Sequence, residues 1–447
     1  HELAKLAASF THDYSALGDL GLAQGGDRTI KVWIGTGRDQ AQALKTMIED
    51  SFTPQTGIRV DLELVDMNIL LQATLAGQGP DVALGVDPSQ PMNFGLRGAV
   101  LDLAQFPDFP EIAGRFYPAS LEPFTFRSWV FALPEQLPFF MLFYRQDILD
   151  ELGIEVPQTW DEVLQVIPEL QKLNMNFGLP WTEIKRNVGG RVGETPAGVG
   201  SLSASQGVLS FLMFLSQKGM DLFGDDAAQT NLHTQEAYEA FQFWTDLYEL
   251  YDLPVEYNAE NRFRLGEMPL LISPYTLYNT LTVFAPELRG EWGFAPVPGT
   301  RRADGTIDRT VLASGTATVI LSGAQDPEAA WEFVKWWTKS ETQTRYALDL
   351  EALMGAAARY PTANPETLRS LPWPLEDFRK LEEQLTWVRG VPEVPGGYMV
   401  GRHLDNAFRR VVNDQAPVRE TLLDYNRVMN EEIRAKRLEL GLDEVEK

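Results

Sequence analysis

Apolar residues recur with regular spacing through the first part of the chain, and this spacing predicts alternating strands and helices. Residues 29–34 form an apolar run of strand length, and residues 58–64 alternate between apolar and polar side chains. Between them a helix is predicted, because apolar residues recur every three or four positions, at Ala41, Leu44, Met47, Ile48 and Phe52. This order predicts a right-handed βαβ unit with parallel strands.

The pattern continues into a larger α/β arrangement. Residues 81–86 predict a third, buried strand, so a doubly wound sheet is expected. Residues 130–144 are rich in β-branched and aromatic side chains, but Pro134 and Pro138 cannot donate hydrogen bonds to a central ladder. We therefore expect the chain to leave one sheet and enter another here. Further helices with one apolar face are predicted over residues 235–251, 328–348 and 417–440.

Residues 142–163 read LFYRQDILDELGIEVPQTWDEV, and this stretch resembles a signature of the extracellular solute-binding proteins that serve ABC sugar importers. Further similar stretches follow the order of maltose-binding-type proteins over nearly the whole chain. They are TIKVWIGTGRDQ and GQGPDVALGV before the signature, and NRFRLGEMPLLISPYTLYN, WGFAPVPG and DPEAAWEFVKWWTKSETQTRYA after it. Several weak motifs in the order of one family are stronger evidence for a resemblance than any single motif is.

The resemblance implies an α/β fold of the two-lobe periplasmic-binding-protein type II, with hinge-linked doubly wound sheets. The first lobe is expected over residues 26–134 and 298–338, and the second over 135–297 and 339–447. A second passage between lobes is expected at residues 296–299, which read Pro-Val-Pro-Gly. Residues 1–25 are expected to form an N-terminal helical extension packed outside the fold; a remnant of a preceding domain is the alternative.

Composition narrows the classes of ligand and site. The 447 residues exceed the size of a single hydrophobic core, so two domains are expected. Lys and Arg number 38 and Asp and Glu number 63, and the net charge of −25 argues against nucleic acid and anionic lipid as ligands. The chain has no cysteine, which excludes disulfides, thiolate zinc sites and thiol nucleophiles.

The location of the protein is inferred only from the resemblance. The chain begins with His1 and shows no charged-then-apolar leader, so we expect a processed form from which any export signal is missing. The resemblance implies an extracellular protein, anchored at the cell surface as a lipoprotein or through a fused anchoring segment, or a periplasmic protein.

The loop after the first strand contains Thr36, Gly37, Arg38 and Asp39 and opens a helix. Ligands of doubly wound sheets bind at the carboxyl ends of the strands, and a helix N-terminus offers free N–H donors. The alternative is an ordinary strand-to-helix turn in which Asp39 caps the helix. The resemblance implies polar ligand contacts here, with Arg38 near a ligand-contacting Lys of relatives.

Four further candidates follow strands or the predicted passage between lobes. The resemblance implies that Asp87 binds a ligand hydroxyl, and Asn93 lies in the same loop. Glu135 and Gln136 are predicted acceptors because a carboxylate or amide at a hinge between lobes is central to the cleft. The alternative for this pair is a hydrogen-bond network within the hinge.

Sugar binding also needs flat aromatic faces. The resemblance implies a stacking residue from the second lobe in Pro-Tyr-Thr-Leu-Tyr-Asn, where Tyr275 and Tyr278 are both candidates and Asn279 is a polar neighbour. Trp181 is predicted as an additional platform.

The resemblance also implies that the turn at residues 392–398 leads into a helix that lines the cleft. Tyr398 and Arg402 lie one helical turn apart, so both are expected to face the ligand. Together with Arg38, Arg402 would favour an acidic sugar such as a uronide, although Arg also binds neutral sugars.

The predicted function is therefore ligand capture without catalysis. The chain is expected to bind an oligosaccharide, neutral or containing uronic acid, as a monomer without cofactor or metal, and to deliver it to ABC transporter permease subunits. The alternatives are a glycosidase or lyase with paired carboxylates, and an adhesion or scaffold module. The sequence has four His and no recognisable catalytic motif. Acidic clusters at residues 221–226 and 304–308 lack the ligand order of a calcium loop.

Overall fold

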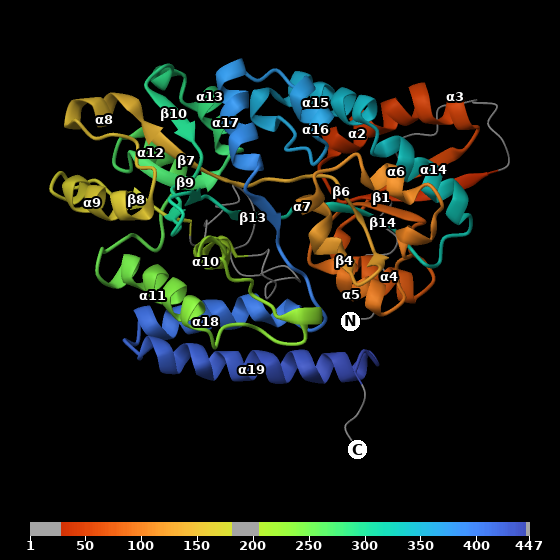
Figure 1. The fold of residues 1–447 in the computed structure, drawn as a ribbon. Helices are drawn as coiled ribbons and strands as arrows, with labels where there is room; N and C mark the ends of the chain where they lie inside the picture. Colours follow the sequence, from red (N-terminus) through yellow and green to blue (C-terminus); the bar gives the residue numbers. More distant parts are fainter. Residues whose placement is uncertain (1–27, 181–204, 444–447) are drawn as a thin grey trace, which may run out of the picture.

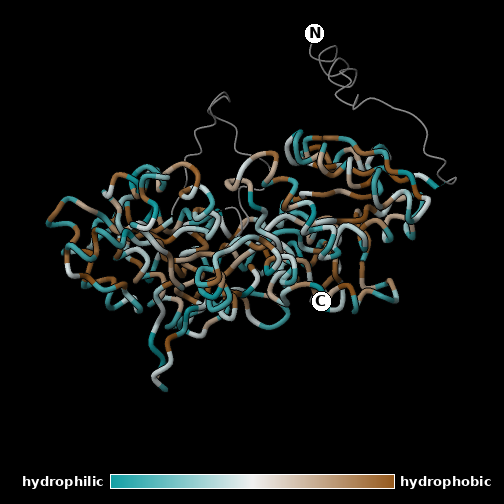
Figure 2. The backbone as a smooth tube through the Cα atoms, turned by 90° about the horizontal axis from the view of Figure 1, so that it is seen from above, coloured by the Kyte–Doolittle hydropathy of each residue, from teal (hydrophilic) through white to brown (hydrophobic). Residues whose placement is uncertain are grey.

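The computed structural model describes residues 28–180 and 205–443. Within these ranges the chain forms two main sheets with their own helices, and the two halves lie end to end in an elongated molecule (Figures 1 and 2). We call the half that contains β1 the first lobe and the other half the second lobe. The predicted extension over residues 1–25 and the candidate Trp181 lie outside the described residues. No helix in the described ranges is long and apolar enough to cross a membrane.

The sheet of the first lobe has the strand order β2-β1-β3-β14-β6. Strand β1 runs parallel to both of its neighbours, with Val32 opposite Leu62 on one side and Val82 on the other. This confirms the predicted βαβ unit and third strand. Strand β14 lies antiparallel between β3 and β6. The strands are β1 (Thr29–Ile34), β2 (Arg59–Leu64), β3 (Val82–Val86), β6 (Leu133–Pro134) and β14 (Ala317–Ile320).

Successive side chains of these strands point to opposite faces of the sheet and feed two separate clusters. Ile30, Val32 and Ile34 belong to one hydrophobic cluster, whereas Trp33 belongs to the other. The first face is covered by α2 (Arg38–Met47), α14 (Pro327–Trp337) and α15 (Ser340–Met354). The second face packs against α4 (Leu70–Leu75), α5 (Gln90–Leu96) and the hairpin of β4 (Thr125–Phe126) and β5 (Trp129–Val130).

The sheet of the second lobe has the order β10-β7-β9-β8. Its central strand β7 is almost entirely apolar and is buried on both faces. The strands are β7 (Phe140–Arg145), β8 (Phe177–Gly178), β9 (Leu270–Pro274) and β10 (Trp292–Ala295). The helices of this lobe are α8 (Gln146–Leu152), α9 (Trp160–Gln171), α10 (Gln206–Gln217), α11 (Gln235–Glu249), α12 (Ala259–Arg264), α13 (Leu277–Phe284), α17 (Leu375–Leu385), α18 (Val400–Val412) and α19 (Val418–Glu439).

Short elements complete the fold. Helix α2 continues through a π-helical turn at Ile48–Phe52 into α3 (Thr53–Thr56). The remaining short helices are α6 (Phe109–Ala113), α7 (Pro118–Leu121) and α16 (Pro365–Ser370). The hairpin β11 (Thr300–Arg301) and β12 (Ile307–Asp308) precedes β13 (Val311–Ala313), which pairs in parallel with β15 (Val388–Gly390).

Three chain passages connect the lobes, and they lie side by side. The first runs from β6 to β7, as predicted from the two prolines, and the second runs from β13 to β14. The Glu135 N–H donates to the Thr316 carbonyl at 2.9 Å, which joins the first passage to the second. The third passage follows α15, and its Ala363 N–H donates to the Glu135 carbonyl at 2.9 Å. The passages therefore form one hydrogen-bonded hinge.

The predicted position of the second passage, residues 296–299, is wrong. Gly299 accepts a hydrogen bond from the Trp160 N–H at 3.1 Å, and the Val297 N–H donates to Gln384 at 2.9 Å, so this stretch packs on α9 and α17 of the second lobe. The Pro-rich segment ends β10 and leads into the β11–β12 hairpin, and the chain crosses only after β13.

The predicted helix over residues 328–348 is divided into α14 and α15. Lys339 has an extended backbone (ψ 144°), which ends the helical path, and Ser340 begins a new one. The Trp337 and Tyr346 rings then pack with centroids 5.0 Å apart. Helix α15 packs on α2 of the first lobe, and Arg345 pairs at 2.7 Å with Asp50 in the π-helical turn after α2. Residues from 339 onward were predicted to belong to the second lobe. The aromatic faces of the helices are buried as predicted, as at Trp337 in α14 and Trp244 in α11.

Candidate ligand-binding site between the two lobes

Two polar loops lie next to each other at the carboxyl ends of β1 and β3. Thr36 is half-buried, and a Cβ at Gly85 would lie 3.3 Å from its methyl group. Gly37, Arg38 and Asp39 are exposed, and Gly37 occupies the N-cap of α2 with no side-chain cap, so Asp39 does not cap the helix. The loop therefore presents a guanidinium, a carboxylate and free helix N–H groups to solvent.

Asp87 and Asn93 belong to the loop and helix that follow β3. The Asp87 carboxylate accepts hydrogen bonds from the Ser89 N–H at 2.9 Å and the Ser89 hydroxyl at 2.5 Å, which shapes the turn into α5. Asp87 remains exposed, whereas Asn93 is half-buried on α5. Because β1 and β3 are neighbours, Asp87 comes to the same edge of the sheet as the Arg38 loop.

Glu135 is buried, and its carboxylate is fully engaged within the first lobe. It accepts hydrogen bonds from the Gly85 N–H at 3.0 Å and the Trp337 indole N–H at 3.2 Å. The hydroxyls of Thr316 and Thr318 donate at 2.9 and 2.7 Å. Burial raises the pKa of Glu135 above its ordinary value, although the four donors oppose this shift. This geometry matches the alternative of a hinge network. Gln136 is half-buried beside Thr362 of the third passage.

The three second-lobe candidates have different surroundings. Tyr275 follows β9 next to the first passage, and its ring lies 4.7 Å from that of Phe139. Its hydroxyl is buried and has no hydrogen-bond partner among the described residues. Burial raises the pKa of the Tyr275 hydroxyl. The Tyr278 hydroxyl donates to Asp377 at 2.7 Å, and its ring packs among Trp292, Phe294 and Trp373. Asn279 is buried on α13. Tyr278 and Asn279 therefore serve the packing of the lobe.

Tyr398 and Arg402 lie at the start of α18, as the sequence predicted. Tyr398 is 39% exposed in the turn Gly397–Met399, and Arg402 is exposed one turn later. A third group of exposed polar and aromatic side chains is thus available on the second lobe.

A cavity of about 460 Å³ lies between the lobes. Its walls come from η4 (Glu122–Phe124) and the β4–β5 hairpin of the first lobe, and from α10, η6 (Asp225–Ala227), β13 and β15 of the second. The lining combines apolar and charged side chains, and consists of Glu122, Thr125, Phe126, Arg127, Leu212, Ser216, Asp221, Leu222, Phe223, Asp226, Ala227, Leu312, Arg389, Gly390, Pro392, Glu393 and Val394. None of the residues predicted as ligand contacts lines it.

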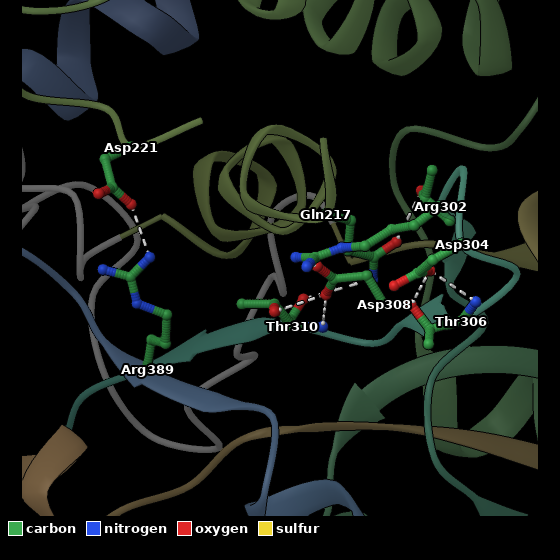
Figure 3. Close-up of polar contacts among 9 residues, drawn as sticks. Gln217, Asp221, Arg302, Asp304, Thr306, Asp308, Thr310 and Arg389 are labelled. Carbon is green, nitrogen blue, oxygen red and sulfur yellow. Dashed lines mark hydrogen bonds and ion pairs between the residues drawn. The ribbon is translucent and has the colours of Figure 1, made fainter. Parts of the chain in front are cut away.

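No local sequence pattern predicted this cavity, because its charged residues lie far apart along the chain. Arg127 pairs with Asp226, and Arg389 pairs with Asp221 at 2.6 Å. The two acidic clusters are engaged in such contacts and in turns, since Asp304 accepts from Thr306 and Asp308 from Thr310 and Arg302 (Figure 3). Within the described ranges, no group of three acidic or His side chains is arranged to hold a metal ion.

This geometry defines a class of protein: a two-lobed α/β protein whose lobes are joined by a hinge of three passages and enclose a cavity between them. A family model described as bacterial extracellular solute-binding protein matches residues 35–344. The chain belongs to this family. Membership supports ligand capture over the glycosidase or lyase alternative, because the family consists of binding proteins.

Individual relatives are distant in sequence but similar in fold. The maltotriose-binding protein of Pyrococcus abyssi is 23% identical over 340 residues, which are 73% of this chain and 66% of that protein. The sugar-binding protein MalE of Xanthomonas citri has a TM-score of 0.72 at 20% identity, covering 93% of this chain and all of that chain. A substrate-binding protein of Listeria monocytogenes in complex with cycloalternan has a TM-score of 0.66 at 16% identity, covering 91% and 99%. These structures share the two-lobe fold.

Proposed function

We propose that this protein captures an oligosaccharide between its two lobes and delivers it to the permease of an ABC importer. The observation that carries the proposal is the pair of lobes around one hinge, with exposed polar loops on the first lobe and the exposed side chains of Tyr398 and Arg402 on the second. Ligand contacts made only when both lobes meet would couple binding to closure.

The relatives support a carbohydrate as the ligand. One is named for maltotriose, and solved structures of the same fold hold maltotetraose and cycloalternan. Because the chain spans 66% of the maltotriose-binding protein, the activity and partners of that protein reach this chain only as part of the proposal. We further propose that the protein acts as an extracellular or periplasmic monomer held near the membrane by a lipid or a fused segment.

The contacts that we assign to the ligand come from three places. Arg38, Asp39 and Asp87 would bind hydroxyl or carboxylate groups from the first lobe. Tyr275 of the second lobe is 1% exposed in this arrangement, so its hydroxyl would reach the ligand only when the lobes move. Tyr398 and Arg402 would complete the site from α18. Two exposed Arg side chains without an ion-pair partner among the described residues favour an oligosaccharide that contains a uronic acid.

Calorimetric titration against matched oligosaccharides would test the ligand class. The panel should contain malto-oligosaccharides and oligogalacturonides of equal chain length. We expect saturable binding of at least one sugar, with the uronide preferred and more sensitive to salt. Failure of every sugar to bind would contradict the proposal. Chromatography after prolonged incubation tests the enzyme alternative, because a binding protein leaves the sugar intact.

Two tyrosine variants separate a ligand contact from a packing role. Tyr275→Phe should leave the free energy of unfolding nearly unchanged, since its hydroxyl has no partner to lose, but should weaken sugar binding. Tyr278→Phe should lose about 0.5–1.5 kcal/mol of stability with its bond to Asp377, and should leave binding intact. Urea unfolding and calorimetry measure the two effects. Equal sugar affinity in wild type and Tyr275→Phe would remove Tyr275 from the site.

A further inference from the structure

One ion pair joins the two lobes at a distance from the hinge. Arg127 lies in the β4–β5 hairpin of the first lobe, and its guanidinium donates to the Asp226 carboxylate at 2.9 and 2.6 Å in a two-pronged contact. Asp226 lies in η6 of the second lobe, and both residues line the cavity between the lobes. Two-pronged Arg–carboxylate pairs are stronger and more directional than single contacts.

Both partners are oriented by their own lobe. The Arg127 guanidinium lies over the Phe126 ring at 5.2 Å, and Phe126 belongs to the hydrophobic cluster of the first lobe. On the other side, Arg437 donates to the Asp226 carboxylate at 2.8 Å and to its carbonyl at 2.7 Å, and Asp443 balances the charge of Arg437. Asp226 would therefore remain paired with Arg437 if the lobes moved apart, and the exposed Arg127 would be solvated by water.

The backbone on both sides of the contact adopts a conformation that L-residues seldom take. Arg127, Asp226 and Ala227 have φ values of 55°, 52° and 52°, and they are three of the six non-glycine residues with positive φ in the described ranges. Such residues persist where the surrounding structure over-determines them, and they concentrate at switch regions and binding clamps. Here it accompanies the contact of Arg127 from the first lobe with Asp226 from the second.

From this geometry we propose that the Arg127–Asp226 pair is a latch between the lobes, which stabilises the lobe arrangement described here against rotation about the hinge. The proposal adds regulation to the proposed function, because lobe movement would govern ligand access. Both side chains are about 40% exposed, so the latch is open to water and salt. An exposed pair of this kind is expected to shift the ratio of lobe arrangements about two- to fivefold.

The chain offers a matched control. Arg389 lines the same cavity and pairs with Asp221 at 2.6 Å, and this pair is also exposed. Both residues of the pair belong to the second lobe. Arg389→Gln therefore removes an equal charge from the same cavity without cutting a link between lobes. Arg127→Lys retains the charge and tests whether the two-pronged geometry matters.

The test measures the distance between lobes without any sugar. Because the chain has no cysteine, spin labels at Gln42→Cys on α2 and Glu236→Cys on α11, both exposed, would report on the two lobes alone. In low salt, Arg127→Gln should shift the distance distribution away from that of the wild type, and Arg127→Lys should shift it less. Arg389→Gln should match the wild type. In wild type, 1 M salt, where the screening length is about 3 Å, should reproduce the Arg127→Gln distribution.

Identical distributions in wild type and Arg127→Gln at low salt would overturn the latch, and so would an equal shift in Arg389→Gln. Because no ligand is present, this outcome is independent of the sugar titrations. A protein that binds no sugar but responds to Arg127→Gln would retain the latch and lose the proposed function.

Discussion

At the scale of single residues, Glu135 is a buried carboxylate that receives hydrogen bonds from three separate segments. Gly85 belongs to β3, Thr316 and Thr318 flank the start of β14, and Trp337 ends α14. Its position in the sequence, directly after Pro134, indicated a residue at a passage between lobes. Its partners are as much as 202 positions away, so their convergence on one carboxylate had no local signal.

Replacing Glu135 by Gln should destabilise the protein by about 1–3 kcal/mol. The Gln amide would place its own N–H donor opposite the N–H donor of Gly85 or Trp337. Neither of these N–H groups can act as an acceptor, so the hydrogen bond would be lost. Urea unfolding of the variant and of Glu49→Gln measures this effect. Glu49 is 65% exposed in the π-helical turn after α2, and its variant should remain within about 0.5 kcal/mol of wild type.

The stability difference between wild type and Glu135→Gln should depend on pH. Because burial raises the pKa of Glu135 above its ordinary value of 4.5, its contribution to stability is complete below pH 4.5 and is lost as the pH rises through the folded-state pKa. Gln does not titrate. The stability difference between wild type and Glu135→Gln should therefore be larger at low pH than at pH 8. A difference that grows with rising pH would show that the carboxylate is stabilised as its anion.

At the scale of elements, the Thr-Trp-Asp-Glu stretch that carries the family resemblance is also the start of a helix. The Thr159 hydroxyl accepts from the Glu162 N–H at 3.3 Å, and the Glu162 carboxylate accepts from the Gln158 N–H at 2.6 Å. These bonds satisfy N–H groups that the first turn of α9 leaves free. Trp160 then enters the core, where its indole donates to Gln217 at 2.9 Å.

Thr159→Ala should therefore cost about 1 kcal/mol of stability through loss of the helix cap. Thr159→Ser keeps the hydroxyl and should recover most of it. Urea midpoints of the two variants provide the comparison. If Thr159→Ser and Thr159→Ala lose the same amount of stability, the packing of the Thr159 methyl group matters more than its helix cap.

Most elements of the first lobe were predictable because burial sets their apolar pattern. Both faces of the inner strands β1 and β3 are buried, which imposes a dense apolar run, whereas the partly exposed edge strand β2 alternates. The division between α14 and α15 was not predictable, because the apolar spacing continues across Lys339 and only the backbone changes direction there. For the site, strand order brought Arg38 and Asp87 to one edge as expected. The packing of Tyr278 against Asp377, and the pairing of Arg127 with Asp226, depend on tertiary contacts with partners 99 positions away.

At the scale of the whole molecule, the hinge depends on how closely its passages approach. Gly315 lies in the second passage, and a Cβ there would overlap the carbonyl oxygen of Gln136 in the first. The position requires Gly because backbone occupies the space of a side chain.

Gly315→Ala should force the first two passages apart and cost about 1–3 kcal/mol of stability. Gly323→Ala is the control, because a Cβ there meets no atom within 4 Å. Thermal unfolding of both variants measures the cost, and scattering with and without sugar measures lobe closure. Equal melting temperatures for the two variants would mean that the passages tolerate separation.

The interleaved order of the strands also bears on how the chain is made. Strand β14 fills the place between β3 and β6, yet it follows them by more than 180 residues. A ribosome-bound chain that has reached only the second sheet thus carries a first sheet with two unpaired edges facing each other. Exposed edges of this kind invite pairing with other chains. The first sheet can therefore be completed only after residues 317–320 have emerged, so the lobe that begins the chain is finished after the second sheet has been synthesised.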